Sequence, residues 1–282
     1  MNQLEETDYN LELTLLGGQS FTWDKKENFY IGTYKETLIV IEKKDTQIFW
    51  QTYPEKDNLE LLSDYLNIKN EVNTEFISKD EHIMNAVNSN PGLRILRQDY
   101  ETTLLNFILS SHKSVKGVRK LVKDISNKYG KQLVSPQGVA FSFPSAEIIA
   151  NLSEKELRDI GAGFRAPYLK AAAAKLVKDR DSMNLENMKT IEVKKYLTSF
   201  VGIGDKIADC ILVFGLGRYN ITPLDIWAKR VLVSFYKLDP RMSYQEMSNW
   251  YSSYFGKETA IAGQFLFEYI RNQPIEKQTL IS

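Results

Sequence analysis

The side chains best suited to chemistry lie in one short stretch of the chain, between two glycines and a later aspartate. The stretch from Phe200 to Cys210 is FVGIGDKIADC, and Pro223-Leu224-Asp225 follows it. Glycines let a phosphate approach the backbone closely, a lysine amine can attack carbon, and a carboxylate can stabilise a developing positive charge. This combination indicates chemistry in which a phosphate is held while an amine attacks a neighbouring carbon atom.

Two helices must position this stretch. Apolar spacing predicts a helix over 192–199, and a second helix is expected to begin near Asp205 as its N-cap residue. Between them, Gly202 and Gly204 permit positive φ and leave the first N–H groups of the second helix free to bind a phosphate oxygen. A tight turn between two core helices would need the same glycines, so the functional interpretation depends on the lysine and aspartate nearby.

Lys206 is expected in the first turn of the second helix, where the helix dipole disfavours an ammonium ion and favours the neutral, nucleophilic amine. Cys210 lies four residues on and shares a helix face with Lys206, so its thiol could form one wall of a pocket. Asp225 could cap the next helix, stabilise a cationic sugar, or do both. The simpler alternatives are a solvated lysine, a buried apolar cysteine and a purely capping aspartate.

Three further motifs flank the hairpin motif at 202–210. They are LGGQSFTW at 16–23, the pair GLRILRQD and NFILSS at 92–99 and 106–111, and GAGFRA at 161–166. Together the four resemble the helix-hairpin-helix DNA glycosylase superfamily and, within it, the bacterial type of 8-oxoguanine DNA glycosylase/lyase. Motifs spread in this order over nearly the whole chain are far more specific than a lone Gly-x-Gly.

The resemblance implies an α+β fold, with an N-terminal antiparallel β-sheet layer like that of TATA-binding protein followed by a mainly α-helical helix-hairpin-helix glycosylase domain. The expected boundary at Pro91-Gly92 gives a sheet domain at 1–90 and a helical domain at 91–282, with the hairpin at about 192–217. Periodicity predicts strands at 29–31, 37–41 and 47–51, and the alternation of Leu11, Leu13 and Leu15 predicts another. Helices are expected at 59–66, 100–109, 115–128, 145–151, 167–177 and 260–271.

The resemblance also implies a division of roles around a base-binding pocket. Lys206 would attack the sugar carbon C1′, and Asp225 would stabilise the cationic sugar that forms as the base departs. The carbonyl of Gly18 would select the lesion, because 8-oxoguanine carries an N7–H donor where guanine has an acceptor.

The flipped base would lie between Cys210 and Phe267, although core packing is the simpler role for the phenylalanine. The glutamine that contacts the base edge in the family falls on Gly263 in an ungapped match. Gln264 takes that role only if the helix is shifted.

The residues expected to contact DNA are Gly202, Gly204, His112, Phe164, Arg165 and Trp227. Arg165 matches one of two family arginines that contact the orphaned cytosine, but Gly117 stands at the other position. Losing one bidentate arginine should weaken discrimination by about 1–3 kcal/mol, which predicts a relaxed opposite-base preference. Trp227 replaces a histidine found after the aspartate in animal members.

The implied activity is that of a base-excision repair enzyme, a DNA N-glycosylase with AP (apurinic/apyrimidinic) lyase activity. It would flip out 8-oxoguanine, excise it through a lysine Schiff base and nick the strand by β-elimination. Two alternatives remain: a non-catalytic helix-hairpin-helix DNA-binding protein, and a glycosylase for another purine lesion. Retention of both Lys206 and Asp225 favours an enzyme, because binding alone needs neither.

Composition limits the other classes. The 282 residues carry 36 basic and 36 acidic side chains, so DNA would be held by backbone N–H groups and a local basic face rather than by a basic coat. One cysteine excludes both a disulfide framework and a four-cysteine iron–sulfur cluster, and two histidines without ligand spacing predict no metal. No cofactor is expected, apart from a monovalent cation that family analogy allows at the hairpin. The expected partner is double-stranded DNA containing 8-oxoguanine, bound by a monomer in the bacterial cytoplasm, at the nucleoid, with no membrane contact.

Overall fold

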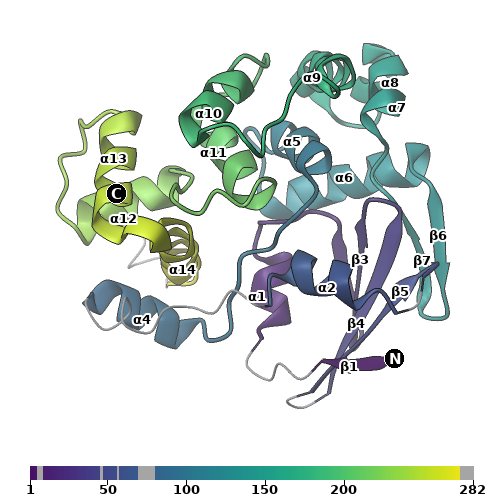
Figure 1. Cartoon of the computed structure of the whole chain (residues 1–282), viewed down its shortest axis with the longest axis horizontal. Helices are drawn as coiled ribbons and strands as arrows, with labels where there is room; N and C mark the ends of the chain where they lie inside the picture. Colours follow the sequence, from purple (N-terminus) through teal and green to yellow (C-terminus); the bar gives the residue numbers. More distant parts are fainter. Residues whose placement is uncertain (5–8, 45–46, 56, 69–79, 274–282) are drawn as a thin grey trace.

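The computed structural model describes residues 1–4, 9–44, 47–55, 57–68 and 80–273. In Figure 1 a twisted sheet lies at the lower right, and most helices lie above it and to its left. The predicted α+β class, with the sheet first in sequence and the helices after it, is confirmed. Within the described ranges, no helix is long and apolar enough to cross a membrane.

Five antiparallel strands form the sheet, in the order β1-β5-β4-β3-β2. They are β1 Asn2–Leu4, β2 Trp23–Lys26, β3 Phe29–Tyr34, β4 Thr37–Lys44 and β5 Gln47–Tyr53. The three strands predicted from periodicity are β3, β4 and β5, and they are confirmed. The central strand β4 is buried from Leu38 to Glu42, since helices α1 and α2 cover one face of the sheet and the β6–β7 hairpin covers the other.

The prediction of a strand through Leu11, Leu13 and Leu15 is wrong, because Leu11–Leu16 forms helix α1. The side chain of Asn10 accepts a hydrogen bond from the Leu13 N–H and caps the helix. The buried face consists of Leu11, Thr14 and Leu15, which is helical spacing. The alternation was misleading because Thr14, a polar residue, is also buried, where its hydroxyl accepts from the Arg94 N–H.

Helices dominate the rest of the chain, and each helix predicted from periodicity is present within one or two residues of its expected bounds. The helices are α2 Leu59–Leu66, α4 Glu81–Ser89, α5 Tyr100–Leu109, α6 Val115–Tyr129, α7 Ala146–Asn151, α8 Glu154–Asp159, α9 Ala166–Asp179, α10 Thr190–Thr198, α11 Asp205–Phe214, α12 Ile226–Ser234, α13 Tyr244–Phe255 and α14 Thr259–Arg271. The small antiparallel pair β6 Gln132–Ser135 and β7 Gly138–Phe141 follows α6.

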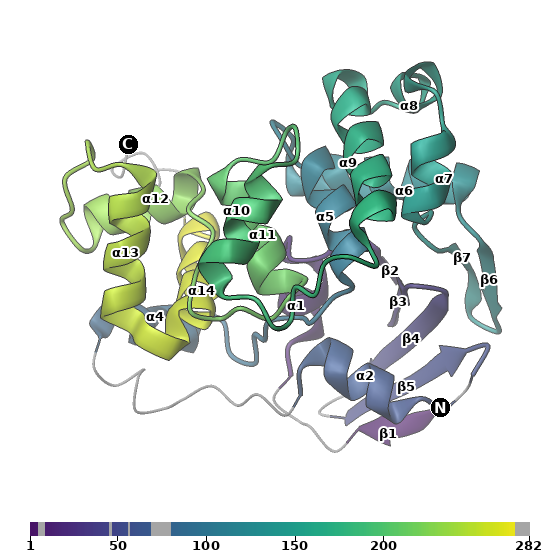
Figure 2. The same cartoon turned by 45° about the horizontal axis from the view of Figure 1, so that its top comes forward.

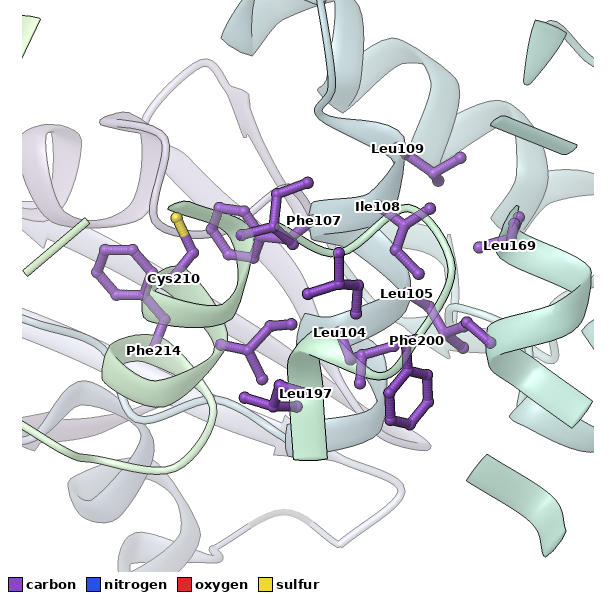
Figure 3. Close-up of a cluster of buried hydrophobic side chains, with 14 of the residues drawn as sticks. Leu104, Leu105, Phe107, Ile108, Leu109, Leu169, Leu197, Phe200, Cys210 and Phe214 are labelled. Atoms are coloured by element: carbon purple, nitrogen blue, oxygen red, sulfur yellow. The ribbon is translucent and has the colours of Figure 1, made fainter. Parts of the chain in front are cut away.

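Two apolar cores support the helical part. One contains α5, α6, α9, α10 and α11, and Figure 3 shows part of it, including Phe107, Cys210 and Phe214. The other joins α12, α13 and α14 with α4, which packs against α14 although it precedes Pro91 in sequence. Figure 2 shows α11 and α14 as neighbours. The site described below lies where these two cores meet.

Candidate active site

The hairpin joins α10 to α11 through residues 199–204. Gly202 has a φ of +87°, and a Cβ there would lie 2.8 Å from Cγ of Tyr168, so a side chain is excluded on both grounds. The expected N-cap at Asp205 is corrected by one residue: Gly204 is the N-cap, and Asp205 is the first helical residue. None of the described side chains caps α11, so its first N–H groups and the positive end of its dipole are left to an external anion.

Beside the hairpin lies a cavity of about 80 Å³ between α11, the segment before α12, and α14. The structure brings all the residues predicted for catalysis and base binding to this one cavity. Its lining residues are Gly18, Phe107, Lys206, Cys210, Phe214, Thr222, Pro223, Asp225, Ala228, Gly263, Gln264 and Phe267. Larger hollows lie elsewhere on the protein, but none of those described brings a lysine together with a thiol and a carboxylate.

Lys206 and Cys210 lie one turn apart on the cavity face of α11. The Lys206 Nζ atom is 5.7 Å from the centre of the Phe107 ring, which places the charge over an aromatic face. Burial raises the pKa of the Cys210 thiol to about 11, and the nearby Lys206 charge only partly opposes this. The thiol is therefore protonated at neutral pH, so Cys210 contributes a neutral, polarisable surface to the cavity rather than a thiolate.

Asp225 is the N-cap of α12. Its Oδ1 atom accepts hydrogen bonds from the N–H groups of Trp227 and Ala228, both at 2.9 Å. No described group donates to Oδ2 of this carboxylate. One oxygen thus fixes the side chain while the other can face a positive charge in the cavity, so capping and charge stabilisation are compatible.

Gly18 belongs to a turn after α1 that is held by two arginines. Arg119 donates to the Leu16 carbonyl at 2.7 Å, and Arg271 donates to the Gly17 carbonyl at 2.9 Å. Gly18 has a φ of +108°, and a Cβ there would lie 3.0 Å from Val115. The two preceding carbonyls are engaged, whereas no described group donates to the carbonyl of Gly18.

Helix α14 supplies the opposite wall. A Cβ at Gly263 would lie 2.0 Å from Oγ1 of Thr222, so this position admits only glycine while Thr222 is in place. Gln264 lines the same cavity and is 8% exposed, which means that no shift of the helix is needed to bring it to the wall. Sequence reasoning missed Thr222 as a lining residue; a glycine among the large side chains of α14 was the available signal.

The residues predicted to contact DNA outside the cavity lie on separate segments: His112 follows α5, Phe164 and Arg165 lie in the turn Gly163–Arg165, and Trp227 lies in the first turn of α12. The exposed rings of His112 and Phe164 are 6.2 Å apart and edge-on to one another. Arg165 is buried, and its guanidinium donates to the carbonyls of Ser111, His112 and Ala162. It therefore joins the two loops that carry the exposed rings. Trp227 is half-buried, with the Arg230 guanidinium 4.9 Å above its ring.

A helical hairpin with an uncapped second helix, next to a cavity that holds a lysine and a carboxylate, is the arrangement expected of helix-hairpin-helix DNA glycosylases. The family model for the HhH-GPD superfamily of base excision DNA repair proteins matches residues 105–255, and that for the N-terminal domain of 8-oxoguanine DNA glycosylase matches residues 2–104. The chain belongs to the HhH-GPD superfamily of base excision DNA repair proteins.

Curated relatives extend over most of the chain. It is 28% identical over 272 residues to the N-glycosylase/DNA lyase of Saccharomyces cerevisiae, which covers 86% of this chain and 72% of the relative. It is 27% identical over 303 residues to the N-glycosylase/DNA lyase OGG1 of Arabidopsis thaliana, covering 99% of this chain and 82% of the relative.

Solved structures give the same picture. The 8-oxoguanine glycosylase/lyase of Clostridium acetobutylicum, in complex with double-stranded DNA containing cytosine opposite 8-oxoguanine, superposes with a TM-score of 0.85 and 28% identity, over 96% of this chain and 97% of that one. The 3-methyladenine DNA glycosylase of Archaeoglobus fulgidus has a TM-score of 0.77 at 20% identity, over 96% and 99% of the two chains, which shows a shared fold alone.

Proposed function

We propose that this protein is a bifunctional base-excision repair enzyme that removes 8-oxoguanine from duplex DNA and then nicks the strand. One observation carries the proposal: Lys206, Asp225 and Gly18 line a single cavity beside an uncapped helix N-terminus. A base inside a duplex is out of reach of any side chain, so the lesion nucleotide must be turned out into this cavity. The hairpin N–H groups would hold a phosphate of the strand while it is turned.

The covalent steps follow from the positions of the two charged residues. As the bond from C1′ to the base breaks, its electron pair leaves with the base, and the Oδ2 atom of Asp225 faces the cationic sugar. The Lys206 amine adds to C1′ and gives one proton to the departing base, and the C1′–O4′ bond then breaks as O4′ takes the second proton, which leaves an imine between Lys206 and the opened sugar. Water then takes a C2′ proton, the electron pair of that C–H bond forms a C2′=C3′ double bond, and the C3′–O bond breaks with its electrons on the departing phosphate, which nicks the strand by β-elimination.

Selection of the lesion would rest on the carbonyl of Gly18. The N7–H of 8-oxoguanine could donate to it, whereas N7 of guanine would present a second acceptor. A backbone carbonyl can serve this purpose only if it cannot turn away, and the bonds of Arg119 and Arg271 to the two preceding carbonyls hold this turn. Cys210 and Phe267 line the same cavity and would flank the flipped base, and Gln264 would contact its edge.

Opposite-base preference would be relaxed for two reasons. Gly117 stands where the resemblance expects an arginine, and the guanidinium of Arg165 is occupied by three loop carbonyls. To reach an orphaned cytosine, Arg165 would first have to give up those bonds, which lowers the net gain from contacting that base. Its position favours a role in holding His112 and Phe164 at the face that meets the DNA.

The test is single-turnover cleavage of duplexes that carry 8-oxoguanine opposite each of the four bases, with an undamaged G·C duplex and a 3-methyladenine duplex beside them. We expect excision and nicking with 8-oxoguanine, at rates within about tenfold for pairs with C and A. Tight binding with no cleavage would indicate a DNA-binding protein without chemistry. Preferred release of 3-methyladenine would indicate a glycosylase for another purine lesion, and strict dependence on cytosine would refute relaxed pairing.

A further inference from the structure

A largely buried polar cluster lies behind the hairpin, between α10, α11 and α13. The Nζ atom of Lys194, on α10, is 2.8 Å from Oδ1 of Asp209 on α11, and 3.4 Å from Oδ1 of Asp205. Asp209 is 0% exposed and Lys194 is 6% exposed. An ion pair at this depth contributes little to the free energy of unfolding once the loss of hydration is counted. Stability alone therefore does not explain why these two charges are buried together.

The cluster continues to a tyrosine on α13. The hydroxyl of Tyr244 donates to Oδ2 of Asp209 at 2.6 Å, and its oxygen accepts from the N–H of Leu224 at 3.1 Å. Leu224 immediately precedes Asp225, and Asp209 lies on the same helix as Lys206, three residues away. A single hydroxyl thus bridges the helix that carries the lysine and the backbone that carries the carboxylate.

Burial and charge hold this hydroxyl in place. Burial raises the pKa of Asp209 to about 6, and Lys194 and Tyr244 partly oppose this by stabilising the carboxylate. The ring of Tyr244 has the Lys194 ammonium 5.2 Å from its centre and the Lys229 ammonium 5.9 Å away. The two partners of the hydroxyl are themselves held in place, because Lys194 pairs with the Asp209 carboxylate and the Leu224 N–H belongs to the backbone. The hydroxyl can therefore fix the distance between them.

We propose that Tyr244 is a positioning residue that sets the separation of Lys206 and Asp225 through its bridge from Asp209 to the Leu224 N–H. The proposal rests on the function proposed above. Base excision needs the amine and the carboxylate at the same sugar, whereas imine formation on a preformed abasic site needs only the amine. Loss of the bridge should therefore slow excision more than it slows imine formation, because a displacement of even 1 Å can lower a rate by roughly 10²-fold.

The experiment compares Tyr244→Phe with Tyr254→Phe. Tyr254 lies on the same helix α13 and donates to a carboxylate, Oδ2 of Asp80 at 3.0 Å, away from the cavity. For each protein, one measures the single-turnover excision rate on an 8-oxoguanine duplex and the borohydride-trapping rate on a preformed abasic-site duplex. The ratio of the two rates does not depend on the folded fraction, because partial unfolding lowers both rates equally.

We expect Tyr244→Phe to lower the ratio of excision to trapping by about tenfold, and Tyr254→Phe to leave it within about twofold of the wild-type ratio. An unchanged ratio in Tyr244→Phe would overturn the positioning role while wild-type excision still supports the proposed function. Absence of excision in the wild type would overturn both. If the single variant does not fold, the triple variant Tyr244→Phe, Asp209→Asn, Lys194→Met replaces it, since it removes both buried charges together, and the same ratio decides.

Discussion

One wall of the cavity, which we call the catalytic wall, is formed by Lys206, Cys210 and Asp225 and comes from one short segment of the chain. The wall that faces it combines residues from the N-terminal and C-terminal regions of the chain. We call the second one the recognition wall; it consists of Gly18, Gln264 and Phe267. Local glycines, helix caps and the Tyr244 bridge fix the catalytic wall. The recognition wall depends on bonds between distant elements, such as that of Arg271 to the Gly17 carbonyl across 254 positions.

The two walls also differ in the charge they bury. Behind the catalytic wall, Asp209 has an ammonium partner and a hydroxyl donor. Behind the recognition wall, Glu268 is 0% exposed and pairs with Arg271 at 2.9 Å, and no group in the described part of the chain donates to its Oε1 atom. Burial raises the pKa of Glu268 to about 7, more than the nearby Arg271 lowers it. The side chains of the catalytic wall thus come from one short segment, with Tyr244 added from α13, whereas the recognition wall depends on Arg271, whose buried partner Glu268 has a raised pKa.

The largest expected effect comes from the catalytic wall. Lys206→Gln removes the nucleophile and should lower single-turnover excision of 8-oxoguanine by roughly 10³-fold or more. Affinity for a duplex with a tetrahydrofuran abasic analogue should stay within a few-fold, because the recognition wall is intact. Lys178→Gln, an exposed lysine of α9, is the control. Cleavage by Lys206→Gln at a near wild-type rate would contradict the assignment of the amine.

Asp225→Asn should cost on the order of 10²–10³-fold in the excision rate, since a charge that faces the cationic sugar is replaced by a neutral dipole. The melting temperature should hardly change, because asparagine is as good an N-cap as aspartate. Asp99→Asn is a matched control: Asp99 caps α5 by accepting from the Thr102 N–H, outside the cavity. Equal kinetic losses in the two variants would remove Asp225 from the chemistry.

On the recognition wall, Gly18→Ala should reduce excision by about tenfold while nicking of a preformed abasic site changes little. A Cβ in this backbone conformation costs roughly 1–2 kcal/mol and would turn the carbonyl away from the base. Gly256 also has a positive φ, +56°, but lies outside the cavity with nothing within 4 Å of an added Cβ. Gly256→Ala should therefore lower stability without altering the ratio of excision to nicking. Equal ratios in both variants would argue against lesion selection at Gly18.

The smallest effect is on stability and depends on pH. Because the folded pKa of Glu268 lies above its usual value of 4.5, its contribution is fully present below pH 4.5 and is lost as pH rises to about 7. The free energy of unfolding of the wild type, from urea titrations, should fall relative to Glu268→Gln by about 1–3 kcal/mol across this window. Glu147 is the opposite case, since Arg180 lowers its pKa to about 2, so Glu147→Gln should show no such slope there. A flat difference for Glu268→Gln would exclude a proton held by this carboxyl.

The sequence predicts the catalytic wall, which is local, better than it predicts contacts between distant segments. The hairpin, the lysine and the capping aspartate lie within about 25 residues, where spacing and glycine chemistry have direct structural meaning. The alternation of Leu11, Leu13 and Leu15 predicts a strand where the chain forms a helix, because the buried Thr14 breaks the apolar pattern of the helix. Thr222 against Gly263, the Tyr244 bridge and the burial of Arg165 arise from contacts between distant segments, which no local pattern encodes.

The central claim is that the catalytic wall carries out covalent chemistry on the sugar through Lys206. The most direct measurement is borohydride trapping of the wild-type protein on an 8-oxoguanine duplex, followed by proteolysis and mass spectrometry of the cross-linked peptide. We predict a single adduct on the peptide that contains Lys206. An adduct on another amine, or base release with no adduct at all, would contradict this account.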